Sequence, residues 1–133
     1  MTFVDTNYFL RFLLADISSQ HQLAKTLFQQ AAGGKVSLFT SAVVIFEIYW
    51  VLLSVYSKNK DQITATLDPL LDMSFIDFEH HSLLKQAISL YTHSSLGLVD
   101  AFNFHYAQSL GARDFKTFDT TLSRRFQTTY NVK

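Results

Sequence analysis

Phe3-Val4-Asp5-Thr6-Asn7 is the stretch on which the expected fold depends. Phe3 and Val4 favour a strand, whereas the two small polar residues after Asp5 favour a turn or a helix cap. We therefore expect a short buried strand that ends at Asp5 and a helix that begins on Thr6 or Asn7. In an open α/β sheet this junction lies in the crevice at the carboxyl ends of the strands, where ligands bind.

The composition predicts one domain over residues 1–133. Hydrophobic residues make up 48% of the chain and aromatic residues 15%, which supports a core and argues against disorder. The chain has no cysteine, so disulfides and thiolate metal sites are excluded. Because 11 Lys+Arg balance 11 Asp+Glu, any nucleic acid must be bound by a local basic patch instead of an overall positive field.

The apolar stretch 8–15 does not have the form of an export signal. It is short, contains Arg11, and follows Asp5 instead of a basic segment. We predict neither an export signal nor a transmembrane span, and we expect a cytoplasmic protein.

Strands and helices are expected to alternate, which predicts an α/β fold with a parallel sheet and right-handed crossovers. The predicted strands are 3–5, 36–39, 75–78 and 114–118, with an edge strand near 130–132. The predicted helices are 7–14, 19–32, 42–55, 60–71, 81–91, 97–110 and 122–126.

Several residues are expected to set the helix ends. Ser19-Gln20-His21-Gln22 has the form of a capping box, and Gly33-Gly34 is a strong stop. Ser41 and Asn59 are predicted N-caps. Pro69 is expected to kink or end its helix, since it supplies no backbone N–H.

Four acids stand where a parallel sheet presents its active edge, or close to it. Asp5 and Asp119 follow predicted strands, and Asp100 opens a helix. Glu47 is the one acid in a strongly apolar helix, so we do not expect it to be an ordinary surface residue. If the four meet, their mutual repulsion requires a cation, and all-oxygen ligands select Mg²⁺ or Mn²⁺. Such an ion activates water and stabilises phosphate charge during phosphodiester hydrolysis.

Each of these acids also has a simpler structural interpretation. Asp5 can be a helix cap, Asp100 can be a first-turn acid in a helix dipole, and Asp119 can start a turn. Glu47 can be a surface residue, which its apolar neighbours disfavour. Both interpretations stay open for each acid alone, and the four together are more informative than any one of them.

Four motifs along the chain stand out together. They are Phe3-Val4-Asp5-Thr6-Asn7, Phe46-Glu47-Ile48-Tyr49-Trp50-Val51-Leu52, Val99-Asp100-Ala101 and Lys116-Thr117-Phe118-Asp119. These motifs resemble those of the PIN domain family, and in particular its VapC-type toxins of bacterial toxin–antitoxin pairs. The resemblance covers essentially the whole chain and preserves the order and spacing of the motifs.

This resemblance implies a three-layer α/β/α fold with a central parallel sheet of four or five strands. It also implies a Mg²⁺- or Mn²⁺-dependent endoribonuclease that cuts RNA and is regulated by a protein antitoxin. The apolar helices leave room for a homodimer interface or for a groove that accepts an antitoxin helix.

The resemblance also assigns roles to residues. The acidic quartet, both catalytic and metal-binding, would be Asp5, Glu47, Asp100 and Asp119. Asp5 and Asp100 would be the firmest metal ligands. Polar support would come from Thr6, Asn7 and Thr117. Asp114 is a rival for the fourth acid, and Asp119 is preferred because it follows the predicted strand instead of starting it.

Other polar and aromatic residues have two readings. The segment Phe102-Asn103-Phe104-His105 is more aromatic and polar than the family pattern. Within it, Asn103 either donates a hydrogen bond to a carboxylate or faces a packing partner. The pair Arg124-Arg125, and also Arg11, contact phosphates or are ordinary solvated cations. Tyr8 or Tyr49, if exposed, stacks on a base. The five histidines show no ligand-like spacing.

Two other functions compete with the nuclease. One is a catalytically weak binding module that keeps the scaffold and acts through dimerisation or protein partners, as the neutral charge allows. The other is a small phosphatase or nucleotidase with Asp5 as nucleophile. It ranks last, because such enzymes generally carry a second Asp two residues later, where this chain has Asn7.

Overall fold

The structure is a computed structural model that describes residues 1–132, with side chains described for residues 1–129. The chain divides into two compact units, the first being Met1–His81 and the second beginning at Ser82. The single domain over residues 1–133 stays a prediction.

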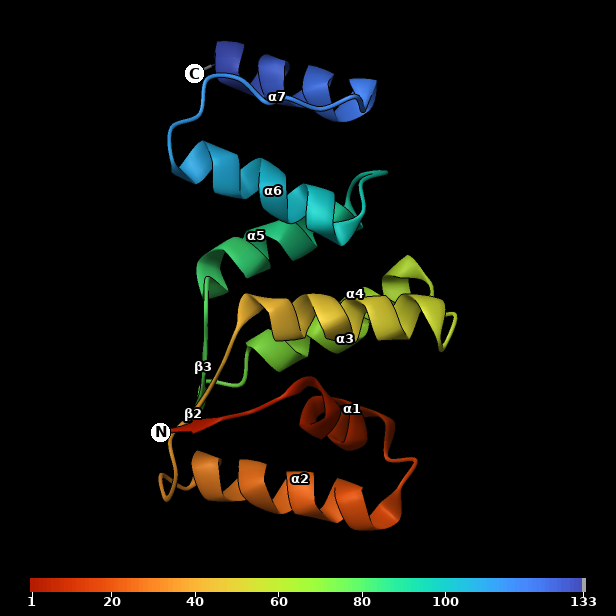
Figure 1. Cartoon of the computed structure of the whole chain (residues 1–133), viewed down its shortest axis with the longest axis vertical. Helices are drawn as coiled ribbons and strands as arrows, with labels where there is room; N and C mark the ends of the chain where they lie inside the picture. The colour runs from red at the N-terminus through yellow and green to blue at the C-terminus, as the bar shows by residue number, and fades with distance from the viewer. Residues whose placement is uncertain (133) are drawn as a thin grey trace. The chain divides into compact units, whose positions relative to one another are not determined.

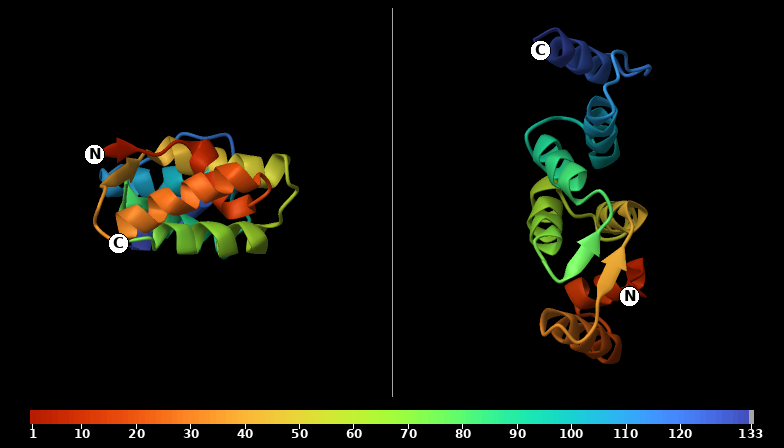
Figure 2. Two further views of the ribbon diagram at one scale, coloured as in Figure 1. Left: turned by 90° about the horizontal axis from the view of Figure 1, so that it is seen from below. Right: turned by 90° about the vertical axis from the view of Figure 1, so that its left-hand side faces the viewer.

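The first unit is built on a parallel sheet of three strands within the described residues. They are β1 (Thr2–Phe3), β2 (Leu38–Thr40) and β3 (Ile76–Phe78), in the order β1-β2-β3. Phe39 lies in register with Phe3 of β1, and Thr40 lies in register with Phe78 of β3. Figure 2 shows β2 and β3 as arrows pointing the same way. The predicted α/β fold with a parallel sheet is therefore confirmed.

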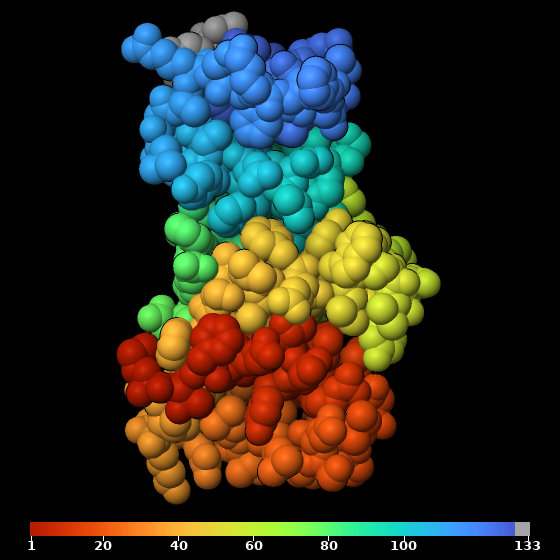
Figure 3. Space-filling view, viewed as in Figure 1, coloured from red at the N-terminus to blue at the C-terminus, as the bar shows by residue number. Residues whose placement is uncertain are grey.

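Four helices of the first unit connect and cover these strands. They are α1 (Thr6–Leu14), α2 (Ser18–Ala32), α3 (Ala42–Ser54) and α4 (Lys60–Leu71). Helix α1 packs against α2 and α3, and α3 also packs against α4 (Figure 1). Figure 3 shows α1, in red, directly alongside α2, in orange. Aromatic rings fill the contact between α1, α2 and β3, with the Phe9 ring 5.6 Å from that of Phe28 and 6.3 Å from that of Phe78.

Strand β1 is more exposed than expected. It lies at the edge of the described sheet and pairs with β2 alone, which leaves Phe3 47% exposed. The buried residue of this segment is Val4, whose N–H donates to the carbonyl of Phe39. Strand β1 ends at Phe3 and both of its residues are exposed, so the prediction of a buried strand over residues 3–5 is wrong in its bounds and in its burial. The buried Val4 follows the strand.

Most predicted helix ends are confirmed. Ser41 caps α3 through a 3.3 Å bond from the N–H of Val44, and Asn59 caps α4 in a capping box with Gln62. Gly33 follows the last residue of α2, and Gly34 adopts a φ of 80° that favours glycine. Helix α4 continues through Pro69 and ends at Leu71, so the proline lies in the last turn.

The capping box predicted at Ser19–Gln22 is wrong. Helix α2 begins at Ser18, with Ile17 as its N-cap and no side-chain cap bond. The N–H of His21 donates to the carbonyl of Ile17 at 2.8 Å, so the first helical bond already encloses Ser19. A serine inside the first turn cannot act as the cap that precedes it.

The second unit is helical. It contains α5 (His81–Thr92), which starts at the last residue of the first unit, α6 (Leu98–Ser109) and α7 (Thr120–Val132). Helix α7 packs against α6 around the buried side chains Leu96, Phe104, Leu122 and Phe126. The rings of Phe104 and Phe126 meet edge to face at 5.7 Å. The predicted helices over 81–91 and 97–110 are confirmed.

The two C-terminal strands predicted from the sequence are wrong. Residues 114–118 are irregular, and 130–132 continue α7, so the sheet within residues 1–132 has three strands instead of four or five. In the 114–118 segment, side chains bond locally: the N–H of Phe115 donates to Asp114 and the N–H of Asp119 donates to the Thr117 hydroxyl. Local side-chain bonds of this kind compete with a strand ladder.

No helix within residues 1–132 has both the length and the apolar character that a membrane crossing requires.

Candidate functional site

Asp5 lies at the junction between β1 and α1, as the sequence predicts. It is the N-cap of α1, and its Oδ1 accepts a 2.8 Å hydrogen bond from the N–H of Thr6. The carboxylate is exposed and sits at the positive end of the helix dipole. The cap interpretation is therefore confirmed, and the exposed oxygens stay available to a ligand.

Glu47 is brought beside this junction from a point 41 residues away from Thr6. The Thr6 hydroxyl donates to Glu47 Oε2, with 3.2 Å between the oxygens. Thr6 is buried, so its side chain holds the acid from inside the fold. Asp5 and Glu47 are thus placed on either side of one buried threonine.

Glu47 is nevertheless exposed, so the expectation that it is not a surface residue is wrong. Helix α3 turns Ile45, Ile48 and Leu52 to the core. Its other side leaves apolar residues in the open, with Val43 at 62% and Trp50 at 63% exposure. The apolar neighbours of Glu47 in sequence therefore do not cover it.

Two polar residues at the carboxyl ends of β2 and β3 are not among the predicted site residues. The buried Thr40 donates its hydroxyl to the Val4 carbonyl at 2.7 Å, which ties β2 to the residue before Asp5. Glu79 follows β3, and its Oε1 accepts from the N–H of Ala42 at the start of α3 at 2.9 Å. The signal for Glu79 was present in the sequence, since it follows a strand as Asp5 does.

Asp100 and Asp119 both lie in the second unit. Asp100 is half-buried in the first turn of α6, after the N-cap Gly97. Asp119 precedes α7, and its Oδ1 accepts from the N–H of Leu122 at 3.0 Å. The N–H of Asp119 in turn donates to the Thr117 hydroxyl at 3.1 Å. Asp100 therefore has the first-turn position that its simpler interpretation requires, whereas Asp119 precedes a helix instead of starting a turn.

Asp114, the rival for the fourth acid, is already paired. Its Oδ2 lies 2.7 Å from Lys116 Nζ, and its Oδ1 accepts from the N–H of Phe115. The hydrogen bond from Lys116 and the positive charge of that ammonium lower the pKa of Asp114, and the same contact raises the pKa of Lys116. Asp114 therefore has a cationic partner, whereas no Lys or Arg among the described side chains forms an ion pair with Asp119.

A groove of about 480 Å³ opens beside the N-terminal half of α1. Its lining residues are Asn7, Tyr8, Arg11, Ile17, Gln20 and Leu23. Asn7 and Tyr8 belong to the first turn of the helix that Asp5 caps, so the groove is lined by residues from the same end of α1.

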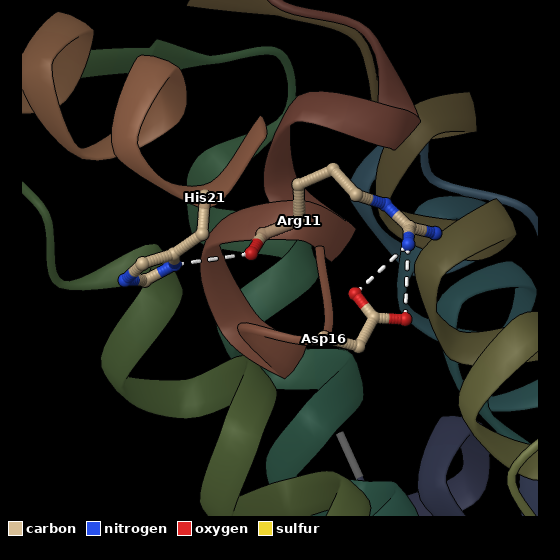
Figure 4. A network of polar contacts seen from close by, with 3 residues as sticks. All are labelled: Arg11, Asp16 and His21. Carbon is tan, nitrogen blue, oxygen red and sulfur yellow. Dashed lines mark hydrogen bonds and ion pairs between the residues drawn. The ribbon is translucent and has the colours of Figure 1, made fainter. Parts of the chain in front are cut away.

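Arg11 of α1 contacts both the α1–α2 connection and α2 (Figure 4). Its Nη1 lies 2.8 and 3.0 Å from the two carboxylate oxygens of Asp16, and its carbonyl is 3.1 Å from His21 Nδ1. Since a carbonyl only accepts, Nδ1 carries the proton in this contact. Arg11 is therefore partnered by an acid through Nη1.

The fit of a divalent ion can be judged from the described side chains. Among residues 1–129, no group of three or more His, Cys, Asp or Glu side chains is arranged to hold a metal. Asp5 and Glu47 supply two exposed carboxylates near one helix N-terminus. Mg²⁺ is typically held by one or two carboxylates together with waters and substrate phosphates, so this pair fits the oxygen chemistry of the ion.

Comparison with known proteins identifies a family. A family model described as PIN domain matches residues 2–125, which is most of the chain. No curated protein and no solved structure matches the chain significantly.

Proposed function

Because the chain belongs to the PIN domain family, a family of nucleases, we propose that it is a metal-dependent endoribonuclease. The parallel sheet with its helices is consistent with the α/β/α fold of that family. Beyond family membership, we propose that the substrate is RNA, that the metal is Mg²⁺ or Mn²⁺, and that four acids hold the metal.

The observation that supports this function most directly is the contact between Thr6 and Glu47. It sets the carboxylate of an α3 residue next to the residue that follows Asp5. Both carboxylates are exposed, and no Lys or Arg among the described side chains forms an ion pair with either of them. An exposed pair of acids without a cationic partner suits a divalent ion and a phosphodiester better than it suits an apolar ligand.

The proposed roles are those that the family resemblance implies for the matching positions. Asp5 and Asp100 would be the principal metal ligands, and Glu47 and Asp119 would complete the site or orient its waters. Thr6 would hold Glu47 in position through its hydroxyl. When bound, Mg²⁺ or Mn²⁺ supplies an activated water and stabilises negative charge on the phosphate.

The test is RNA cleavage with Mg²⁺ or Mn²⁺ by wild type and by Asp5→Asn. Asn keeps the side-chain oxygen that caps α1 but removes the negative charge, so we expect a folded protein with little or no cleavage. Asp77→Asn is the matched control, because Asp77 is an exposed acid in the middle of β3. Equal cleavage by wild type and Asp5→Asn would refute the assignment.

We further propose that the protein acts in the cytoplasm as a VapC-type toxin, as a homodimer regulated by a protein antitoxin. Expression of the wild type should then arrest growth, and Asp5→Asn should not. Co-expression of a short neighbouring reading frame with a DNA-binding fold should restore growth. Light scattering of the purified protein should give the mass of a dimer, and a monomer would contradict that part of the proposal.

Calorimetric titration with Mn²⁺ distinguishes the nuclease from the catalytically weak binding module. A nuclease of this kind should bind Mn²⁺, and the heat of binding should fall in Asp5→Asn. If wild type shows no divalent-ion binding and no cleavage, the chain keeps the scaffold without the chemistry.

A further inference from the structure

Basic residues are concentrated in the C-terminal part of this neutral chain. Residues 1–81 carry five Lys+Arg against eight Asp+Glu, whereas residues 82–133 carry six Lys+Arg against three Asp+Glu. Helix α7, over Thr120–Val132, contains two arginines and no acid. The net charge of zero therefore conceals a basic segment at the C-terminal end of the sequence.

Helix α7 has one face committed to the core of its unit. Leu122 and Phe126 are buried, at 2% and 1% exposure, and the Phe126 ring contacts those of Phe104 and Phe115 at 5.7 and 5.3 Å. This apolar contact holds α7 beside α6 (Figure 1). Because Leu122 and Phe126 fix the rotation of α7 about its own axis, they also determine which of its residues face outward.

The remaining surface gathers cationic and hydroxyl side chains. Thr121, Arg124, Arg125 and Thr128 are spaced i, i+3, i+4 and i+7, which places them on one face of the helix. All four are exposed and, with Thr129, line a shallow groove of about 320 Å³. Among residues 1–129 no carboxylate forms an ion pair with Arg124 or Arg125. We call this set of four residues the α7 basic face.

We infer that the α7 basic face binds the phosphodiester backbone of the RNA substrate. This inference rests on the proposed ribonuclease function. Two adjacent guanidinium groups present forked donors that match phosphate oxygens, and threonine hydroxyls are further donors to the same oxygens. Helix α7 itself contains no acid, and the carboxylate of Asp119 that precedes it accepts from the N–H of Leu122.

An acidic protein segment would also be attracted to two arginines. RNA is favoured because the face carries hydroxyl donors beside the guanidinium groups and exposes no large apolar side chain among its four residues, whereas protein interfaces depend on buried apolar anchors. The α7 basic face therefore suits a backbone of repeated phosphates better than a peptide.

The experiment measures binding of a labelled single-stranded oligouridylate by fluorescence anisotropy in the Asp5→Asn background, without added metal, at several salt concentrations. Each phosphate contact to a single strand contributes roughly −0.7 to the slope of the logarithm of the binding constant against the logarithm of the salt concentration, here called the salt slope. The double variant Arg124→Gln/Arg125→Gln should therefore make the slope less steep by about 1.4 and weaken binding on the order of tenfold at 0.1 M salt. Arg124→Lys/Arg125→Lys should keep the slope, because it keeps both charges.

Lys25→Gln/Lys35→Gln is the control for net charge, since it also removes two exposed cations. It should leave the salt slope unchanged, and circular dichroism should show that every variant is folded. A DNA strand of the same length should lose affinity in the Gln variant to the same extent if phosphates alone are contacted. A larger loss for RNA would add a contact to the 2′-hydroxyl.

An unchanged slope in the Gln variant would overturn the inference. So would binding of polyglutamate, but not of RNA, that depends on the arginines, because that result assigns the face to an acidic protein. If the wild type cleaves RNA but the Gln variant keeps the salt dependence of binding, the proposed function stands and this inference fails. If RNA binding depends on the arginines but the wild type does not cleave RNA, this inference stands and the proposed function fails.

Discussion

The hydroxyl of Thr6 donates to Glu47 Oε2 across 3.2 Å, and it does so from a residue that is 6% exposed. The acceptor is an exposed carboxylate on another helix, so the bond connects the interior of the first unit to its surface. The neighbouring backbone N–H of Thr6 is taken by Asp5. One residue therefore sets the positions of two acids.

Thr6→Val tests this arrangement with little change of volume. We expect it to lower the free energy of unfolding by about 1 kcal/mol, the typical value of a lost hydrogen bond. A double-mutant cycle with Glu47→Ala, measured by urea denaturation, should show coupling of about 0.5–1.5 kcal/mol.

The control for that cycle is Thr40→Val. Thr40 is equally well buried and bonds to the Val4 carbonyl instead of a carboxylate, so it should destabilise the protein without coupling to Glu47. Additive effects of Thr6→Val and Glu47→Ala would show that the contact contributes nothing.

The elements that could be predicted from the sequence are those with a local cause. The strand-to-helix junction at Asp5 and the caps Ser41 and Asn59 all form as predicted, because a side-chain oxygen one to three residues before a free amide of the first turn is enough to specify them. The stop at Gly33-Gly34 has a similarly local origin in a positive φ.

The elements that could not be predicted depend on which neighbour a segment meets. Residues 114–118 have the composition of a short strand, but local hydrogen bonds and the contact of Phe115 with Phe126 hold them irregular. The exposure of Glu47 depends on how α3 is rotated, and an almost uniformly apolar helix does not specify its rotation. The cap formed by Glu79 joins residues 37 positions apart.

The ion pair of Asp114 and Lys116 predicts a titration. The hydrogen bond and charge of Lys116 hold the pKa of Asp114 below its usual range, so the carboxylate stays charged at neutral pH. The pair's contribution to stability is therefore present above the ordinary pKa of an aspartate and is lost as the pH falls through the lowered pKa. Because both side chains are largely exposed, the contribution is small.

Carbon NMR of the Asp114 carboxyl group measures this directly. Lys116→Gln should raise the pKa of Asp114 towards its ordinary value. Arg113→Gln removes an adjacent exposed cation that makes no ion pair with Asp114, so it should move the titration less. A titration of Asp114 that does not respond to Lys116→Gln would contradict the pair.

Phe126 and Phe118 form a matched pair of aromatic substitutions in the second unit. Phe126 is 1% exposed and contacts two other phenylalanine rings, whereas Phe118 is fully exposed. Phe126→Ala should cost about 3–5 kcal/mol of unfolding free energy, because it leaves a cavity under α7. Phe118→Ala should change the same quantity by less than about 0.5 kcal/mol. Equal effects in thermal denaturation would mean that α7 is not anchored through Phe126.

Asp119 allows its role as a cap to be separated from its proposed role as a catalytic acid. Its Oδ1 accepts from the N–H of Leu122, an interaction that an asparagine side chain can also make. Asp119→Asn should therefore keep the stability of α7, whereas Asp119→Ala should cost about 1 kcal/mol. Both variants should lose RNA cleavage by roughly a hundredfold or more if the negative charge acts in the reaction.

The comparison of these two variants decides between the readings because each predicts a different pattern. A residue that only caps a helix gives full cleavage in Asp119→Asn and a small loss in Asp119→Ala that follows the loss of folded protein. A catalytic acid gives equal loss of cleavage in both, with stability reduced in only one. Urea denaturation and cleavage rates measured on the same preparations, with Asp114→Asn as the control acid, distinguish the two patterns. If Asp114→Asn abolishes cleavage while Asp119→Asn does not, the fourth acid is Asp114 despite its contact with Lys116.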